Sequence, residues 1–302
     1  MTRTLAMLML ALLAALPSCA TNDGSAVDVA VSKQATNPLV VLTNRTGNVR
    51  LSLPGGDVGP LKLHMFGEQL MGAVGSLSGS RSEFWIDGKA VSGRMAGSVQ
   101  IDPPIAGSEW QYAIVNLPAT NVSGLKSFQR RFLCIEPDLI IVLDEVSLTE
   151  PALVETGYWF PSRLSHDSVR DEWVVQTPLA GVTARFLSSP KSKQTRWETT
   201  EGGAVRAITN SATAFVRSTV AEKVREFYQI TVLVVHAAQS RRSLAFKLLE
   251  SDTSIGVRVH RDGLPTLAAF RKASCVGEAN LTGMKFTGPA AVDVFRPKKK
   301  KS

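Results

Sequence analysis

Histidine and tyrosine are the side chains of this sequence best suited to proton transfer, and the chain has four histidines and three tyrosines. His64 lies on the polar side of a short apolar segment together with Lys62, and a turn-forming sequence that contains Arg45 precedes it. We take His64, Arg45 and Tyr112 as the first candidates for a catalytic group. The alternative is that each of these residues is an ordinary surface or core group.

The other three histidines have different sequence surroundings. His166 follows Tyr158 and Trp159 closely, so it is a candidate for ligand binding. His236 ends an apolar run and is expected in the core, whereas His260 lies between two arginines and is expected to face solvent.

Aromatic side chains provide a second kind of candidate site. Trp85, Trp110, Tyr158 and Trp159 lie on or beside predicted strands, as His166 does. A sheet face that carries aromatic rings beside arginine or lysine can hold an acidic sugar polymer by stacking and charge. The alternative is that most of these rings pack in the core. The sequence shows no glycine-rich phosphate loop, no Ser-His-Asp arrangement and no metal-ligand spacing, so we expect no cofactor and no metal.

The N-terminus has the pattern of an export signal. A positive residue near the start precedes an apolar run over residues 5–16, which is short for a membrane span. The sequence Leu16-Pro17-Ser18-Cys19 then resembles a bacterial lipobox, in which the cysteine is acylated. We expect a signal peptide over 1–18, lipidation of Cys19 and an outer-membrane lipoprotein. Ordinary secretion to the periplasm or medium and an uncleaved anchor remain alternatives.

The remaining two cysteines, Cys134 and Cys275, form one possible disulfide, which an oxidising compartment would permit. Two buried free thiols are the alternative.

Charge gives little support for a nucleic-acid partner. The formal charge is +8, but Arg296 and Lys298–Lys301 supply five of these charges, which leaves +3 for the rest of the chain. We expect a basic disordered tail over 296–302 and a flexible tether over 19–37.

Between these ends, residues 38–295 predict one all-β domain. Short alternating apolar segments are separated by turn sequences such as Asp87-Gly88. No segment shows a sustained helical period, and only 219–227 and 240–250 would accept a helical turn. So many short strands predict a large antiparallel two-sheet β-sandwich, similar to a supersandwich.

Residues 130–146 are the most informative segment. They predict a hairpin around Pro137-Asp138, with a half-buried first strand and a second strand buried on both faces. Because it is so apolar and is flanked by charge at both ends, we place this hairpin in the middle of a large sheet.

This hairpin carries a resemblance to a known family. The successive segments FWIDGKAV, WQYAIVNL, KSFQRRFLCIEPDLIIVLDEVSL and ALVETGYWFP resemble the β-sandwich domain of heparinase II/III-like polysaccharide lyases. Arg131 and Asp144 occupy the places of an arginine-bearing strand and of an aspartate that ends the next strand. The resemblance covers about residues 38–275. Complete lyases of that family carry a helical toroid before the sandwich, and this chain has no helical run to form one.

The resemblance implies β-elimination on uronic-acid polymers, in which a base, an acid and a cation act on the sugar. In these terms His64, Tyr112 and Arg45 would be the catalytic set. Without a toroid, however, we expect an exported module that binds or positions acidic polysaccharide at the cell envelope. A polysaccharide lyase, alone or with a separate toroid subunit, and a purely structural envelope lipoprotein are the alternatives.

Overall fold

The computed structural model describes residues 30–32, 39–54, 61–72, 84–91, 100–101, 105–107, 109–117, 122–161, 163–199, 213–238, 240, 244–262 and 264–294. The expected signal peptide, Cys19, most of the tether and the basic tail lie outside these residues. In the described part every strand pair is antiparallel and no helix occurs, so the all-β sandwich is confirmed. Within these ranges, no helix is long and apolar enough to span a membrane.

A nine-stranded central sheet organises the chain. Eight of its strands follow the order β14-β15-β16-β19-β12-β11-β10-β8, and β9 pairs with β10. Their bounds are β8 (Gln100–Ile101), β9 (Ile105–Ala106), β10 (Trp110–Leu117), β11 (Leu125–Ile135), β12 (Leu139–Ala152), β14 (Leu164–Asp167), β15 (Glu172–Gln176), β16 (Ala180–Ser189) and β19 (Val224–Ala237). The predicted hairpin is β11–β12, and it lies inside this sheet, as the apolar sequence indicated.

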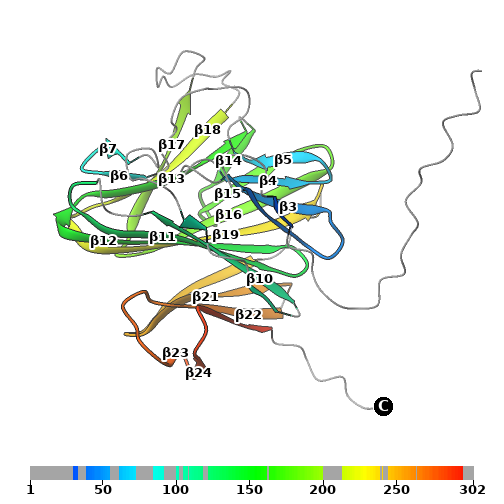
Figure 1. Ribbon diagram of the computed structural model, residues 1–302. Helices are drawn as coiled ribbons and strands as arrows, with labels where there is room; N and C mark the ends of the chain where they lie inside the picture. Colours follow the sequence, from blue (N-terminus) through cyan, green and yellow to red (C-terminus); the bar gives the residue numbers. More distant parts are fainter. Residues whose placement is uncertain are drawn as a thin grey trace, which may run out of the picture.

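Two five-stranded sheets cover one face of the central sheet (Figure 1). Sheet A contains β1 (Ala30–Ser32), β2 (Leu39–Thr43), β3 (Val49–Pro54), β4 (Lys62–Met65) and β5 (Glu68–Met71), in sequence order. Sheet B has the order β17-β18-β13-β6-β7, with β6 (Phe84–Ile86), β7 (Lys89–Ala90), β13 (Val154–Pro161), β17 (Ser192–Thr199) and β18 (Thr213–Val220). Strand β1 lies within the expected tether and pairs with β2.

The opposite face of the central sheet packs against sheet D, which is orange to red in Figure 1. Sheet D has the order β20-β21-β22-β25, with β20 (Leu244–Glu250), β21 (Ser254–Arg261), β22 (Leu264–Arg271) and β25 (Ala290–Val294). A small hairpin of β23 (Ala279–Leu281) and β24 (Met284–Phe286) packs on its outer side. The described chain therefore has more sheets than the two-sheet expectation, and the central sheet is covered on both faces.

Two hydrophobic cores follow from the alternation of side chains along the central strands. In β12, Val142 points into the first core, towards sheets A and B, whereas Ile141 and Leu143 point into the second core, towards sheet D. This explains the continuous apolar run in β12, because both of its faces are buried. The expectation of a helical turn at 219–227 and at 240–250 is wrong, since strands β18, β19 and β20 occupy most of these residues.

Candidate anion-binding site

A cavity of about 230 Å³ lies where the central sheet meets the end of β22 in sheet D. We call it the cationic pocket. Tyr112 and Ile114 line it from β10, Gln129 and Arg131 from β11, and Arg271 from the end of β22. The remaining lining residues follow β22 or precede β25, and they are Lys272, Ala273, Cys275 and Pro289.

Arg131 is a fixed part of the pocket wall. Its Nη2 lies 2.5 Å from Glu145 Oε2 and also donates to Gln129 Oε1, while its Nη1 donates to the carbonyl oxygen of Arg271. The other oxygen of Glu145 accepts the backbone N–H of Ala273 at 2.9 Å. Because both charges are buried and paired, Arg131 and Glu145 attach the loop after β22 to the central sheet.

Lys272 is also paired. Its Nζ lies 2.8 Å from Glu250 Oε1 and 5.0 Å from the centre of the Tyr228 ring. Burial opposes ionisation of Glu250, but hydrogen bonds from Lys272 and Ser189 and the charge of Lys272 outweigh it and lower the pKa of Glu250. Burial and the nearby charges of Glu145 and Glu226 raise the pKa of Tyr228, so this phenol stays neutral.

Arg271 differs from the other two cations. Its Nη1 donates to two backbone carbonyls, of Gly277 at 3.3 Å and of Thr287 at 2.8 Å. Among the described residues it has no carboxylate partner, and its Nε and Nη2 have no hydrogen-bond acceptor. A guanidinium with unused donors, held in place by its other nitrogen, is suited to bind a carboxylate or sulfate.

The predicted catalytic trio is not assembled in the structure. Tyr112 points into the second core. Its neighbour Gln111 points the opposite way and donates to the Thr43 carbonyl at 2.6 Å. His64 lies on β4 of sheet A, and the Arg45 backbone N–H donates to Glu136 at 2.9 Å, so both lie on the first-core side. The central sheet therefore separates Tyr112 from the other two residues.

His64 has a perturbed pKa nonetheless. Burial is the main cause that lowers the pKa of His64, and the positive charges of Lys62 and Arg50 lower this pKa further.

The predicted binding aromatics divide into buried and partly exposed groups. Tyr158 is fully buried in the first core, so it cannot contact a polymer, and its assignment is wrong. Trp159 is 7% exposed and packs on Phe215 with 4.6 Å between ring centres. Trp85 is half-buried on the same side of sheet B and lies 4.8 Å below the guanidinium of Arg217, which pairs with Glu155. Trp110 is partly buried against the second core.

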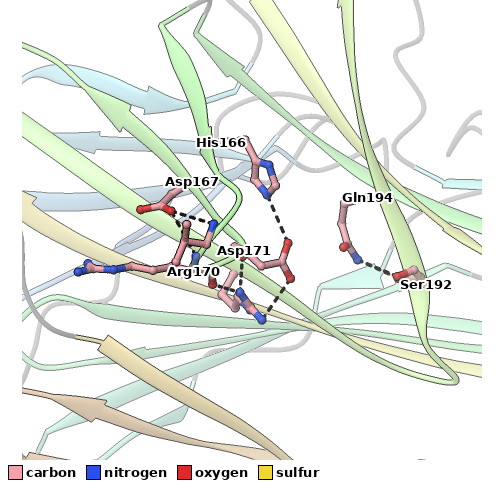
Figure 2. A network of polar contacts seen from close by, with 8 residues as sticks. His166, Asp167, Arg170, Asp171, Ser192 and Gln194 are labelled. Atoms are coloured by element: carbon pink, nitrogen blue, oxygen red, sulfur yellow. Dashed lines mark hydrogen bonds and ion pairs between the residues drawn. The ribbon is translucent and has the colours of Figure 1, made fainter.

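His166 is exposed at the edge of the central sheet, on β14. Its Nε2 lies 3.3 Å from Asp171 Oδ1, and its ring packs against Trp173 in a tilted arrangement with 4.4 Å between ring centres. Arg185 pairs with the other oxygen of Asp171 at 3.1 Å and donates to the Arg170 carbonyl. Figure 2 shows how these contacts fasten the β14–β15 turn, while Ser192 and Gln194 interact separately. We interpret this network as structural support for the turn.

Both cysteines are free thiols, so the predicted disulfide is wrong. Cys134 packs against the first core, where burial and the charge of Glu136 raise the pKa of its thiol. Cys275 lines the cationic pocket on the other side of the central sheet. No cluster of His, Cys, Asp or Glu in the described ranges could hold a metal ion.

One polar cluster was missed by the sequence reasoning. Arg130 Nε lies 2.6 Å from Asp144 Oδ1 inside the first core, and the Tyr158 hydroxyl donates to Asp144 Oδ2 at 2.8 Å. The guanidinium of Arg130 also lies 4.8 Å from the centre of the Tyr158 ring. The sequence pattern at 128–132 could have indicated this cluster. Side chains alternate along a strand, so Arg130 shares a face with the apolar residues Phe128 and Phe132.

Comparison with known proteins supports this geometry at the level of fold. No protein-family model matches the chain, and no curated protein sequence matches it. Among solved structures, a heparinase III gene product superposes with a TM-score of 0.59 at 12% identity, over 78% of this chain and 41% of that chain. A heparan sulfate lyase HepC mutant from Pedobacter heparinus gives a TM-score of 0.58 at 13% identity, over 77% of this chain and 41% of that chain. Another heparinase III structure gives a TM-score of 0.56 at 10% identity, over 85% of this chain and 41% of that chain.

The chain therefore has the fold of one part of heparinase III-type lyases, and the predicted resemblance to their β-sandwich is confirmed. It spans about two fifths of the length of these matched structures.

Proposed function

We propose that this protein is a β-sandwich module that binds acidic, uronate-containing polysaccharide through the cationic pocket. The fold agrees with this proposal, because the matched structures are named as lyases of heparin-type polysaccharides. The observation that carries it is Arg271, a guanidinium that lines a cavity and has no carboxylate partner in the described chain. Charge-assisted bonds from arginine to carboxylate are a common basis for such recognition.

Binding is tested by calorimetric titration with oligogalacturonate at low and moderate salt. We expect measurable binding that weakens as salt increases, since part of the attraction is between screened charges. Arg271→Gln should weaken binding about tenfold or more, as expected when one charged hydrogen-bonding partner is lost. Arg225→Gln is the matched control, because Arg225 does not line the pocket and its side chain is 64% exposed in a surface ion pair with Glu150. Equal binding by the wild type and Arg271→Gln would contradict the proposed site.

Elimination activity is a second candidate function, and Tyr112 in the pocket wall favours it. A tyrosine beside an arginine can protonate a leaving group next to a neutralised carboxylate. None of the described residues that line this pocket is a histidine, however, so a base would have to come from another residue or from a partner. Incubation with uronate polymers, followed by ultraviolet detection of unsaturated sugars, tests this function. A Tyr112→Phe variant that lacks the product signal would support it, and no signal from the wild type would exclude elimination by this chain alone.

We further propose that the protein is exported and anchored through acylated Cys19, with secretion and a structural envelope role as the alternatives. Radiolabelled palmitate should be incorporated into the wild type and not into Cys19→Ser. Label in neither protein would favour ordinary secretion.

A further inference from the structure

The three cations of the pocket differ in how their charges are compensated. Arg131 faces Glu145 and Lys272 faces Glu250, whereas the Arg271 guanidinium donates to carbonyl oxygens and has no carboxylate partner among the described residues. A further carboxylate, Glu226, accepts a hydrogen bond from the Tyr228 hydroxyl at 3.3 Å, next to Lys272. The pocket is therefore lined by three cations, of which Arg271 has no carboxylate partner in the described chain, while the carboxylates that contact Arg131, Lys272 and Tyr228 lie behind this lining.

We infer that Glu250 is a specificity-determining residue, which limits the pocket to sugars that carry a single anionic group. This inference rests on the proposed function. By pairing with Lys272, Glu250 leaves one uncompensated charge, on Arg271, to bind one carboxylate. The ligand class is a polyuronate with one carboxylate on each sugar, as distinct from a densely sulfated polymer.

The physical basis of this selectivity is repulsion between like charges, together with the lack, among the described lining residues, of a free cation to pair with a second anionic group. A second anionic group on the same sugar would approach Lys272, whose charge is already engaged, and would come near the carboxylates of Glu145 and Glu226. Like charges brought together at an interface disfavour the wrong ligand strongly. The cavity of about 230 Å³ is also smaller than the roughly 300–1,000 Å³ of sites that hold drug-sized ligands, so it suits a single sugar unit.

Glu250 is placed to exert this control without being essential to the fold. Its side chain is 34% exposed and belongs to β20, the edge strand of sheet D, so a neutral isostere is expected to fold. The titratable and charged groups that face it and its lysine are Glu145, Glu226, Tyr228, Lys272, Arg131 and Arg271.

The test compares two probes of equal length, an oligogalacturonate and a heparin oligosaccharide, by calorimetric titration at one ionic strength. The wild type should bind the oligogalacturonate more tightly. Glu250→Gln should raise the affinity for the heparin probe by about tenfold and change that for oligogalacturonate much less, because the released Lys272 can pair with a sulfate. Glu250→Asp, which keeps the charge, should retain most of the wild-type preference.

Glu150→Gln is the matched control, since it also removes one negative charge. Glu150 belongs to a surface ion pair in which its side chain is 79% exposed. An unchanged ratio of affinities in Glu250→Gln, with binding still lost in Arg271→Gln, would overturn the role of Glu250 and leave the proposed function intact. An equal gain in Glu150→Gln would attribute the effect to net charge and would also overturn it. No binding of either probe by the folded wild type would instead refute the proposed function.

Discussion

At the scale of single residues, the neighbouring Arg130 and Arg131 point into opposite cores, and each meets a buried carboxylate there. The sequence placed these arginines at the charged ends of an apolar hairpin. It gave no sign that the charges would be buried, because the burial comes from the sheets that cover both faces of the hairpin, while both carboxylate partners lie on the neighbouring strand β12. Charged residues are rarely buried unless they are paired.

Removing one partner of the first pair should destabilise the protein strongly. Asp144→Asn leaves Arg130 charged in the first core and weakens the acceptor of the Tyr158 hydroxyl. We expect the free energy of unfolding to fall by about 3–5 kcal/mol. Urea denaturation measures this loss, and Asp252→Asn, at an exposed turn, should change the midpoint little. Replacing both partners with Arg130→Met and Asp144→Leu should cost less than Asp144→Asn alone, and the opposite order would contradict this explanation.

His64 makes stability depend on pH. Its folded pKa is lowered by burial and by Lys62 and Arg50, so below about pH 6.5 the unfolded chain binds a proton more readily than the folded protein does. The wild type should lose stability as the pH falls from 8 to 5, and His64→Gln should reduce that loss. Urea midpoints across this range measure the effect, and parallel curves for the two proteins would show that His64 does not contribute.

At the scale of elements, close contacts between strands depend on particular glycines. Gly157 on β13 faces the ring of Phe215 on β18, and a Cβ at this position would lie 2.2 Å from Phe215 Cζ and 2.6 Å from the Val216 carbonyl oxygen. Gly157→Ala should therefore cost about 1–3 kcal/mol of stability by overpacking. Gly288→Ala is the control, because a Cβ at Gly288 would lie 3.5 Å from the Ala290 carbonyl oxygen, an ordinary van der Waals contact. Thermal unfolding of the two variants should separate them clearly.

The hairpin β11–β12 was predictable from sequence because its alternation, turn and apolar run all agree. The division of the strands among several sheets was not. Short strands such as β6 (Phe84–Ile86) have a local pattern that fits either a core-facing or an outer sheet. Their sheet membership depends on pairing with β13, which is far away in the sequence. Local periodicity carries no information about such partners.

The candidate site was predictable only in part, for the same reason. Tyr112 was selected and does line the pocket, but Arg271 and Lys272 resemble ordinary surface cations in the sequence. The pocket becomes visible only when β10, β11 and the end of β22 are brought together in three dimensions.

At the scale of the whole molecule, the two cores share the central sheet, so damage to one should weaken the entire fold. Ile141→Ala, at a fully buried position facing sheet D, should cost about 2–5 kcal/mol. We expect near- and far-ultraviolet circular dichroism to give coincident unfolding transitions in both wild type and variant. Val169→Ala, at a side chain 93% exposed, is the control and should have little effect. Separate transitions for the two cores would contradict this coupling.

The opposite directions of Arg130 and Arg131 also define how β11 can align with its neighbours. Side chains alternate along a strand, so a slip by one residue would move Arg130 towards sheet D and Arg131 towards sheets A and B. Each guanidinium would then lose its carboxylate and enter apolar surroundings, and Asp144 and Glu145 would remain buried without their partners. Misaligned forms of this hairpin are thus much less stable than the native one. The two ion pairs therefore fix the register of β11 against its neighbours. Apolar side chains alone would tolerate several registers.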